Sequence, residues 1–195
     1  MKFYTRSEAR SAATRAQAKS KHIMLDSVLN EAIKNQEMQN RFDIFLSHAI
    51  KDADLILGVK TLLEESGFTV YVDWIIDPSL ERDKVNAATA DILRKRMRQC
   101  KSLIYIHTFS SKESKWMPWE LGYFDGYRPE KVSVLPLTFE EDKEFKGQEY
   151  LELYPTITKS EYLDGLKYAW VKGKRLPDFI KLSLKSKHVF FSELV

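Results

Sequence analysis

Short apolar segments alternate with amphipathic segments along the chain between residues 41 and 138. Four of the apolar segments are rich in β-branched and aromatic residues, which favours strands at this length. They span residues 42–46, 68–72, 102–106 and 132–135. Strands that alternate with helices indicate an α/β fold, in which a parallel sheet is covered by helices on both faces.

Three helices are predicted between these strands, because apolar residues recur there at three- and four-residue intervals. The first begins at Asp52 and is stopped by Gly67, and the third lies at about Trp119–Tyr127. The apolar face of the first consists of Leu55, Val59, Leu62 and Leu63, and that of the second of Val85, Ala88, Ile92 and Leu93. Each helix is expected to bury this face against the sheet.

The predicted topology is flavodoxin-like, with the strand at residues 42–46 in the centre and the strand order 2-1-3-4-5. An acidic loop precedes a fifth strand predicted at Leu151–Tyr154. Two short helices are expected after it. One spans Glu161–Trp170, and the other has its apolar face at Leu176, Phe179, Ile180 and Leu184.

Ligands of such a sheet bind beyond the carboxyl ends of the strands, near the point where the strand order reverses. This rule nominates Ser47 and His48, the loop at Trp74–Asp77, and the segment after Thr108.

The first 39 residues differ in composition from the rest of the chain. Residues 1–22 carry six Lys or Arg and one acid, whereas the other 173 residues carry 25 basic and 27 acidic side chains. This part is rich in Ala and has no Gly or Pro, which favours a helix. Its second half has Leu25, Leu29, Ala32 and Ile33 on one face. We therefore predict a helical N-terminal extension over residues 1–39 and an α/β domain over residues 40–195.

Three interpretations of the extension are open. It packs on the domain through its second half, it mediates self-association, or it is an organelle-targeting peptide, although no cleavage signal is visible. We expect the extension to be dispensable to the sheet and to control assembly or contact with a partner.

The composition disfavours several classes of protein. The single cysteine, Cys100, excludes a disulfide framework within the chain, and no metal site is expected because the four histidines do not fall at metal-ligand spacing. No apolar run approaches the ~20 residues of a membrane span. The α/β part also lacks the excess positive charge of a nucleic-acid binder. We expect a cytoplasmic protein that binds neither a membrane nor a nucleic acid.

The segment Ser114–Leu121 combines groups that suit one kind of reaction. Pro118 favours the first turn of a helix, and Glu120 is expected in the same turn, where the helix dipole favours its ionised form. Trp116 and Trp119 flank it with flat aromatic surfaces. A carboxylate beside aromatic rings suits the stabilisation of a cationic, oxocarbenium-like transition state. The alternative is structural: an acid that complements a helix dipole, next to core tryptophans.

Two segments resemble a known family. Arg41–His48 resembles the first conserved box of Toll/interleukin-1 receptor (TIR) domains, a strand with the pattern aromatic-Asp-x-Phe-Leu/Ile-Ser. Ser114–Leu121 is similar to the family's Ser-x-Trp-Cys-x-x-Glu-Leu motif. The resemblance covers roughly residues 41–137, with Asp77 and Pro78 in the position of the family's BB loop. The sequence around residues 119–126 looks closer to bacterial members.

Three features depart from the family pattern. Met117 stands where the family usually has Cys, and Ala49 stands where a basic residue often follows the first strand. The family also has a third conserved box, a Phe-Trp pair near the end of the domain, for which Trp170 is only a weak candidate in this chain.

Enzymatic TIR domains cleave the N-glycosidic bond of NAD+, release nicotinamide and form ADP-ribose or a cyclic isomer, often as an immune signal. The resemblance implies that Glu120 is the catalytic carboxylate and that Trp116 stacks in the pocket. The other substrate contacts that it implies are Ser47, His48, Ser114, Trp74 and Asp77. The last two lie on the BB loop, which in assembled TIR enzymes can complete the site of a neighbouring copy.

The resemblance also implies the partners. NAD+ is the substrate and no further cofactor is needed. We expect self-association through the TIR domain and the N-terminal helix, and a downstream effector that senses the product in antiphage defence. Two alternatives are a non-catalytic module for TIR–TIR interaction and a nucleoside deoxyribosyltransferase-like enzyme, which has a similar sheet and a catalytic glutamate.

Overall fold

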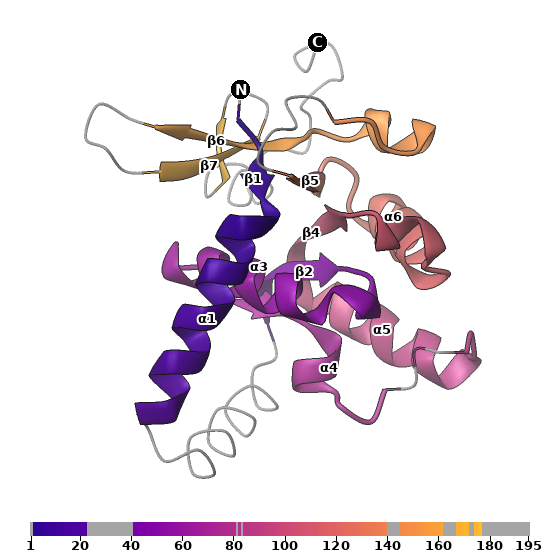
Figure 1. Cartoon of the computed structure of the whole chain (residues 1–195). Helices are drawn as coiled ribbons and strands as arrows, with labels where there is room; N and C mark the ends of the chain where they lie inside the picture. The colour runs from indigo at the N-terminus through magenta and orange to yellow at the C-terminus, as the bar shows by residue number, and fades with distance from the viewer. Residues whose placement is uncertain are drawn as a thin grey trace.

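The computed structural model describes residues 2–22, 41–80, 82, 84–139, 145–161, 167–171 and 174–176. Five parallel strands form a sheet in the order β1-β5-β4-β2-β3 (Figure 1). They are β1 (Tyr4–Thr5), β2 (Phe42–Ser47), β3 (Val70–Tyr71), β4 (Cys100–His107) and β5 (Val132–Thr138). This is the α/β, flavodoxin-like class that the sequence pattern predicts.

Helices cover both faces of the sheet (Figure 1). α1 (Arg6–His22) and α3 (Ala53–Glu65) lie on one side, and α5 (Ala87–Gln99) and α6 (Trp116–Tyr127) lie on the other. The loops contain the short helix α4 (Asp73–Ile76) and three 3-10 turns, η1 (Ile50–Asp52), η2 (Ser110–Glu113) and η3 (Glu149–Leu153).

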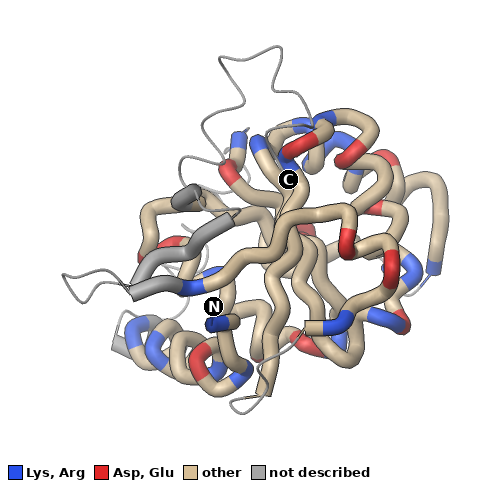
Figure 2. The backbone as a smooth tube through the Cα atoms, turned by 90° about the horizontal axis from the view of Figure 1, so that it is seen from above, with Lys and Arg blue, Asp and Glu red and all other residues tan. Residues whose placement is uncertain are grey.

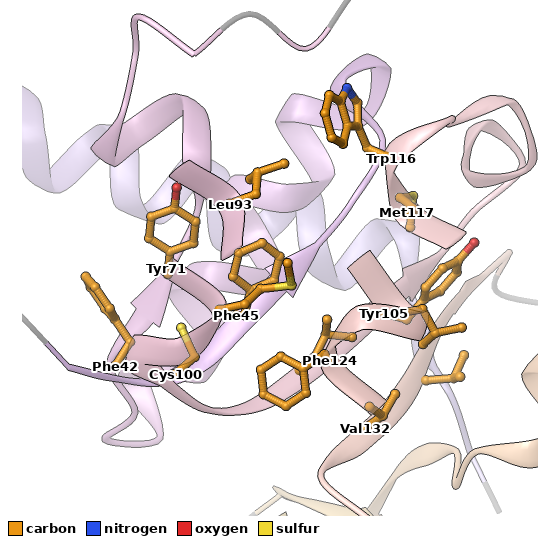
Figure 3. Close-up of a cluster of buried hydrophobic side chains, with 14 of the residues drawn as sticks. Phe42, Phe45, Tyr71, Leu93, Cys100, Tyr105, Trp116, Met117, Phe124 and Val132 are labelled. Atoms are coloured by element: carbon orange, nitrogen blue, oxygen red, sulfur yellow. The ribbon is translucent and has the colours of Figure 1, made fainter. Parts of the chain in front are cut away.

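Each face of the sheet has its own apolar core, because neighbouring side chains of a strand point to opposite faces. On β2, Phe45 packs with residues of α5 and α6, whereas Ile44 and Leu46 pack with residues of α3. Figure 3 shows the first core, with Phe45 between Tyr71 and Tyr105. The central strands are buried on both faces, as their continuous apolar segments predict.

The four predicted strands lie in the predicted relative order, but the fifth position of the sheet differs. Leu151–Tyr154 does not form a strand, because Glu149–Leu153 is the turn η3, in which Leu151 is buried. The position beside β5 is taken by β1, and a single bridge joins Thr156 to β5. With two glutamates among its five residues, the η3 segment has too few apolar side chains for a place buried on both faces.

The buried face of α5 also differs from the prediction. Leu93 is buried as expected, but Val85, Ala88 and Ile92 are exposed. The cause is the start of the helix. Asn86 caps it by accepting a hydrogen bond from the backbone N–H of Thr89 at 2.8 Å, so Val85 lies before the helix. The buried residues of α5 are Thr89, Ala90, Leu93 and Met97.

The prediction of a helix at Glu161–Trp170 is wrong. The strands β6 (Ile157–Glu161), β7 (Lys167–Val171) and β8 (Lys174–Arg175) form a separate antiparallel sheet there. Isoleucine, threonine, tyrosine, tryptophan and valine in β6 and β7 explain the preference for strands. The apolar residues predicted for the second half of the extension and for the last helix, apart from Leu176, lie outside the described residues.

The start of the N-terminal extension belongs to the sheet. Thr5 ends β1 and caps α1 through a reciprocal pair of hydrogen bonds with Glu8. The Glu8 N–H donates to Thr5 Oγ1 at 3.2 Å, and the Thr5 N–H donates to a Glu8 carboxylate oxygen at 2.9 Å. The expectation that the extension is dispensable to the sheet is therefore wrong for these residues, because β1 is one of the strands.

α1 packs closely on α3 because small residues face each other. Ala9, Ala12 and Ala13 are buried, and Gly58 of α3 lies directly against the backbone of Ala9. A Cβ atom at residue 58 would lie 1.7 Å from the carbonyl oxygen of Ala9, so a larger residue there forces the helices apart. The ion pair between Arg10 and Asp54 is exposed and adds little to this packing.

Charged residues of both signs are interspersed over the described parts of the chain, as Figure 2 shows from above. Among the helices that the structure describes, none has the length and apolar character required to cross a membrane.

Gly58→Ala tests the packing of α1 on α3. We expect the substitution to lower the free energy of unfolding by about 1–3 kcal/mol, because the added methyl group overpacks the contact with Ala9. Gly126→Ala is the control, since that glycine of α6 has open space around it and alanine favours a helix. Urea denaturation measures both variants. Equal or higher stability of Gly58→Ala would contradict the close packing.

Candidate active site

Glu120 lies in the second turn of α6, not in the first turn as the sequence predicts. The helix begins at Trp116, and the Ser114 hydroxyl accepts a hydrogen bond from the backbone N–H of Met117 at 3.2 Å. Pro118 remains in the first turn, where a backbone N–H has no partner within the helix. The helix dipole is therefore weaker at Glu120 than expected, and the positive charge near this residue comes from elsewhere.

The Glu120 carboxylate is completely buried and is contacted from two segments of the chain. The hydroxyl of Ser47, the last residue of β2, donates a hydrogen bond to Glu120 Oε2 at 2.6 Å. On the other side, Arg82 Nη2 lies 3.0 Å from Glu120 Oε1. Within the described part of the chain Oε1 accepts no well-aligned hydrogen bond, so the contact with Arg82 is an ion pair.

Arg82 also binds a second buried carboxylate, that of Asp73. Asp73 is the first residue of α4, directly beyond the edge of the sheet at β3. Burial alone would raise the pKa of Asp73, but the positive charges of His48 and Arg82 outweigh burial and hold this pKa well below its usual value. One guanidinium thus contacts both carboxylates in the interior.

His48 completes this buried group. Its Nδ1 lies 2.7 Å from the carbonyl oxygen of Leu46, and its Nε2 lies 3.3 Å from Asp73 Oδ1. Both ring nitrogens therefore face oxygen acceptors, an arrangement that the protonated ring satisfies. His48 orients Asp73, which in turn contacts Arg82, and has no direct contact with Glu120 in this arrangement.

Trp116 forms one wall of the site. Its side chain is buried, its indole N–H donates to the backbone carbonyl of Arg82 at 3.0 Å, and its ring packs edge-on against Trp119 at 5.5 Å between centroids. A cavity of about 250 Å³ lies beside it, lined also by Arg82, Ser114 and Lys51. Figure 3 shows Trp116 and Met117 at the start of α6. This cavity is smaller than most ligand pockets, which span roughly 300–1,000 Å³.

The structure brings together most of the residues that the sequence nominates. Glu120 and Ser47 are in contact, His48 is linked to Glu120 through Asp73 and Arg82, and Trp116 and Ser114 line the adjacent cavity.

The side chains of Trp74 and Asp77 bind elsewhere, although the backbone N–H of Trp74 donates a hydrogen bond to Asp73 Oδ1 at 2.7 Å. Trp74 packs with the apolar core on the opposite face of the sheet. Both carboxylate oxygens of Asp77 accept hydrogen bonds from Arg96 of α5, at 2.7 and 2.8 Å, and one of them also accepts a hydrogen bond from the Tyr71 hydroxyl. A role for these two residues in the site of a neighbouring copy stays a prediction.

Two residues of the site are missing from the sequence prediction, Asp73 and Arg82. Asp73 directly follows the predicted second strand, so its position at the carboxyl edge of the sheet was a usable signal. Arg82 lies in a segment without apolar periodicity, and no pattern in the sequence distinguishes it from the other arginines.

Comparison with known proteins identifies related sequences. A family model described as "TIR domain" matches residues 44–169. The chain is 49% identical over 139 residues to "Probable 3' cyclic ADP-D-ribose synthase ThsB'" of Bacillus cereus (strain MSX-D12), which is 71% of this chain and 72% of that protein. It is 32% identical over 107 residues to "Putative cyclic ADP-D-ribose synthase TIR2" of Cytobacillus dafuensis, which is 53% of this chain and 28% of that protein.

Asp73→Asn tests the charge balance of the buried group. Because the pKa of Asp73 is lowered on folding, the ionised side chain stabilises the folded protein above the ordinary aspartate pKa of about 3.9, and this stabilisation is lost as the pH falls. We expect the Asp73→Asn protein to be less stable by about 3 kcal/mol at pH 7. The difference from wild type should narrow between pH 5 and pH 3 in urea denaturation.

Asp91→Asn is the matched control, because Asp91 is exposed and pairs with Arg94 at the surface. Its stability should follow that of the wild type at every pH. A difference between wild type and Asp73→Asn that stays constant down to pH 3 would show that Asp73 is not held ionised by its neighbours.

Proposed function

The chain belongs to the TIR domain family, and on this premise we propose that it is an enzyme that cleaves the bond between nicotinamide and ribose in NAD+. The products are nicotinamide and a cyclic ADP-D-ribose, because both related proteins carry the name of a cyclic ADP-D-ribose synthase. The observation that supports this most directly is the Glu120 carboxylate, fixed by Ser47 beside Trp116 at the carboxyl edge of the sheet.

The reaction requires stabilisation of positive charge on the ribose. When the glycosidic bond breaks, its electron pair stays with the ring nitrogen, and nicotinamide leaves as a neutral molecule. The anomeric carbon becomes electron-poor, and a fixed carboxylate nearby stabilises this oxocarbenium-like state. The hydrogen bond from Ser47 orients the Glu120 carboxylate for this role. Trp116 borders the adjacent cavity, where its indole can contact a flat ring of the substrate.

The bond to the ribose then forms with an oxygen acceptor. Attack by a hydroxyl group of the same molecule gives the cyclic product, and attack by water gives linear ADP-ribose. In both cases the attacking oxygen loses its proton, so charge and atoms balance.

Self-association and signalling belong to the same proposal. The side chains of Ile50 and Phe109 are largely exposed in the loops beyond β2 and β4, at the edge of the sheet that carries the site. Exposed apolar residues of this kind suit contact with another copy of the chain. The product would be read by a separate effector protein in antiphage defence.

Glu120→Gln tests the enzyme and its carboxylate together. This change keeps the shape of the side chain and removes its charge, so release of nicotinamide from NAD+ should fall by about a hundredfold or more. Glu65→Gln is the control, because Glu65 is an exposed glutamate that pairs with Arg15 away from the cavity. Chromatography of the reaction mixture measures nicotinamide and identifies the ADP-ribose product.

The same assay separates the alternatives. Exchange of the base of a deoxynucleoside, with NAD+ untouched, would identify a deoxyribosyltransferase-like enzyme instead. Equal nicotinamide release by wild type and Glu120→Gln would remove Glu120 from the mechanism. No turnover of either substrate by protein that self-associates would support the non-catalytic interaction module.

A further inference from the structure

We propose that the Arg82 side chain competes with the positively charged nicotinamide ring of NAD+ for the place beside Glu120. In the structure its guanidinium occupies the place beside Glu120 that the cationic part of the substrate must reach. The inference rests on the proposed function, and it assigns to Arg82 the control of access to the catalytic carboxylate.

Glu120 is buried, and Arg82 covers part of its carboxylate. Its side chain has no exposed surface, because Ser47 contacts one carboxylate oxygen and Arg82 lies over the other. The Arg82 side chain is itself only 8% exposed. A substrate can contact the carboxylate at Oε1 only after the guanidinium has moved.

The buried site holds more than one charged group. Glu120 and Asp73 are two carboxylates in a buried site, and Arg82 is in contact with both. Two carboxylates left together without a cation in a buried site are strongly unfavourable. The nicotinamide ring of NAD+ carries a positive charge on its ring nitrogen, so it can replace the guanidinium beside Glu120 without leaving this charge unbalanced. His48 remains beside Asp73 when Arg82 departs.

Arg82 lies next to the cavity beside Trp116. Its side chain lines the cavity of about 250 Å³, and its backbone carbonyl accepts the hydrogen bond from Trp116. Movement of the whole residue, backbone as well as side chain, would therefore enlarge the cavity, free the Trp116 indole N–H and expose Glu120 in one step. These three changes convert a site that is too small for most ligands into one that a flat cationic ring can enter.

This arrangement predicts a specific kinetic signature. If the open site is a minor fraction of the protein, the apparent affinity for NAD+ is reduced by that fraction, whereas the chemical step after binding is unaffected. Weakening the contact of Arg82 should therefore lower KM and leave kcat unchanged. A residue that binds the substrate would have the opposite effect on KM.

Arg82→Gln is the decisive variant. We expect its KM for NAD+ to fall about tenfold below that of the wild type. This is the result if the wild-type site is open about one-tenth of the time and the variant site is always open. The KM of Arg82→Lys should lie between those of Arg82→Gln and the wild type, because one ammonium group cannot contact two carboxylates as the planar guanidinium does. Arg94→Gln is the control, since Arg94 pairs with Asp91 at the surface. A KM that is unchanged or raised in Arg82→Gln overturns the proposal.

A second measurement does not depend on turnover. Glu120→Gln removes one of the two charges that Arg82 contacts, so amide hydrogen exchange in the peptide that contains Arg82 should become faster than in the wild type. Glu65→Gln, at an exposed glutamate that pairs with Arg15, should not change this exchange rate. Equal exchange rates in Glu120→Gln and wild type contradict the proposal. If no variant releases nicotinamide, the proposed function fails, and hydrogen exchange still decides whether Arg82 depends on Glu120.

Discussion

The arrangement of the site depends on the buried ion pairs that Arg82 makes with Glu120 and Asp73. A carboxylate without exposed surface is stable only with a nearby cation and hydrogen bonds, and Glu120 has both from other parts of the chain. Ser47 comes from the end of β2, Asp73 from the residues after β3, and Arg82 from the segment before α5. The ion pairs and the hydrogen bond from Ser47 thus join three segments to α6.

The sheet brings these segments together because parallel strands place their carboxyl ends at one edge. The two apolar cores keep the edge rigid from both faces, and Trp116 belongs to one of these cores while it also borders the cavity. Arg82 contacts two buried carboxylates, and one of them, Glu120, is the group that we propose performs the chemistry. In this proposal, a cationic substrate takes over the charge balance when Arg82 moves away.

The sequence alone predicts the class of fold and much of the site, for physical reasons that differ between elements. Strands buried on both faces produce continuous apolar runs, and their carboxyl ends identify Ser47 and His48. The predicted face of α5 was wrong because one capping residue, Asn86, shifts the start of the helix. β1 was missed because two residues are too short to give a pattern. Arg82 was missed because a long charged side chain reaches its partners through space, without any periodicity in the sequence.

The central claim is that Glu120 acts on the ribose of NAD+ after Arg82 has left it. A crystal structure of the Glu120→Gln protein soaked with NAD+ tests this most directly, since the variant retains the shape of the site and turns the substrate over slowly. We expect the anomeric carbon of the nicotinamide ribose beside the substituted side chain at position 120, the nicotinamide ring against Trp116, and the Arg82 guanidinium displaced. NAD+ bound elsewhere, with Arg82 still against residue 120, would contradict it.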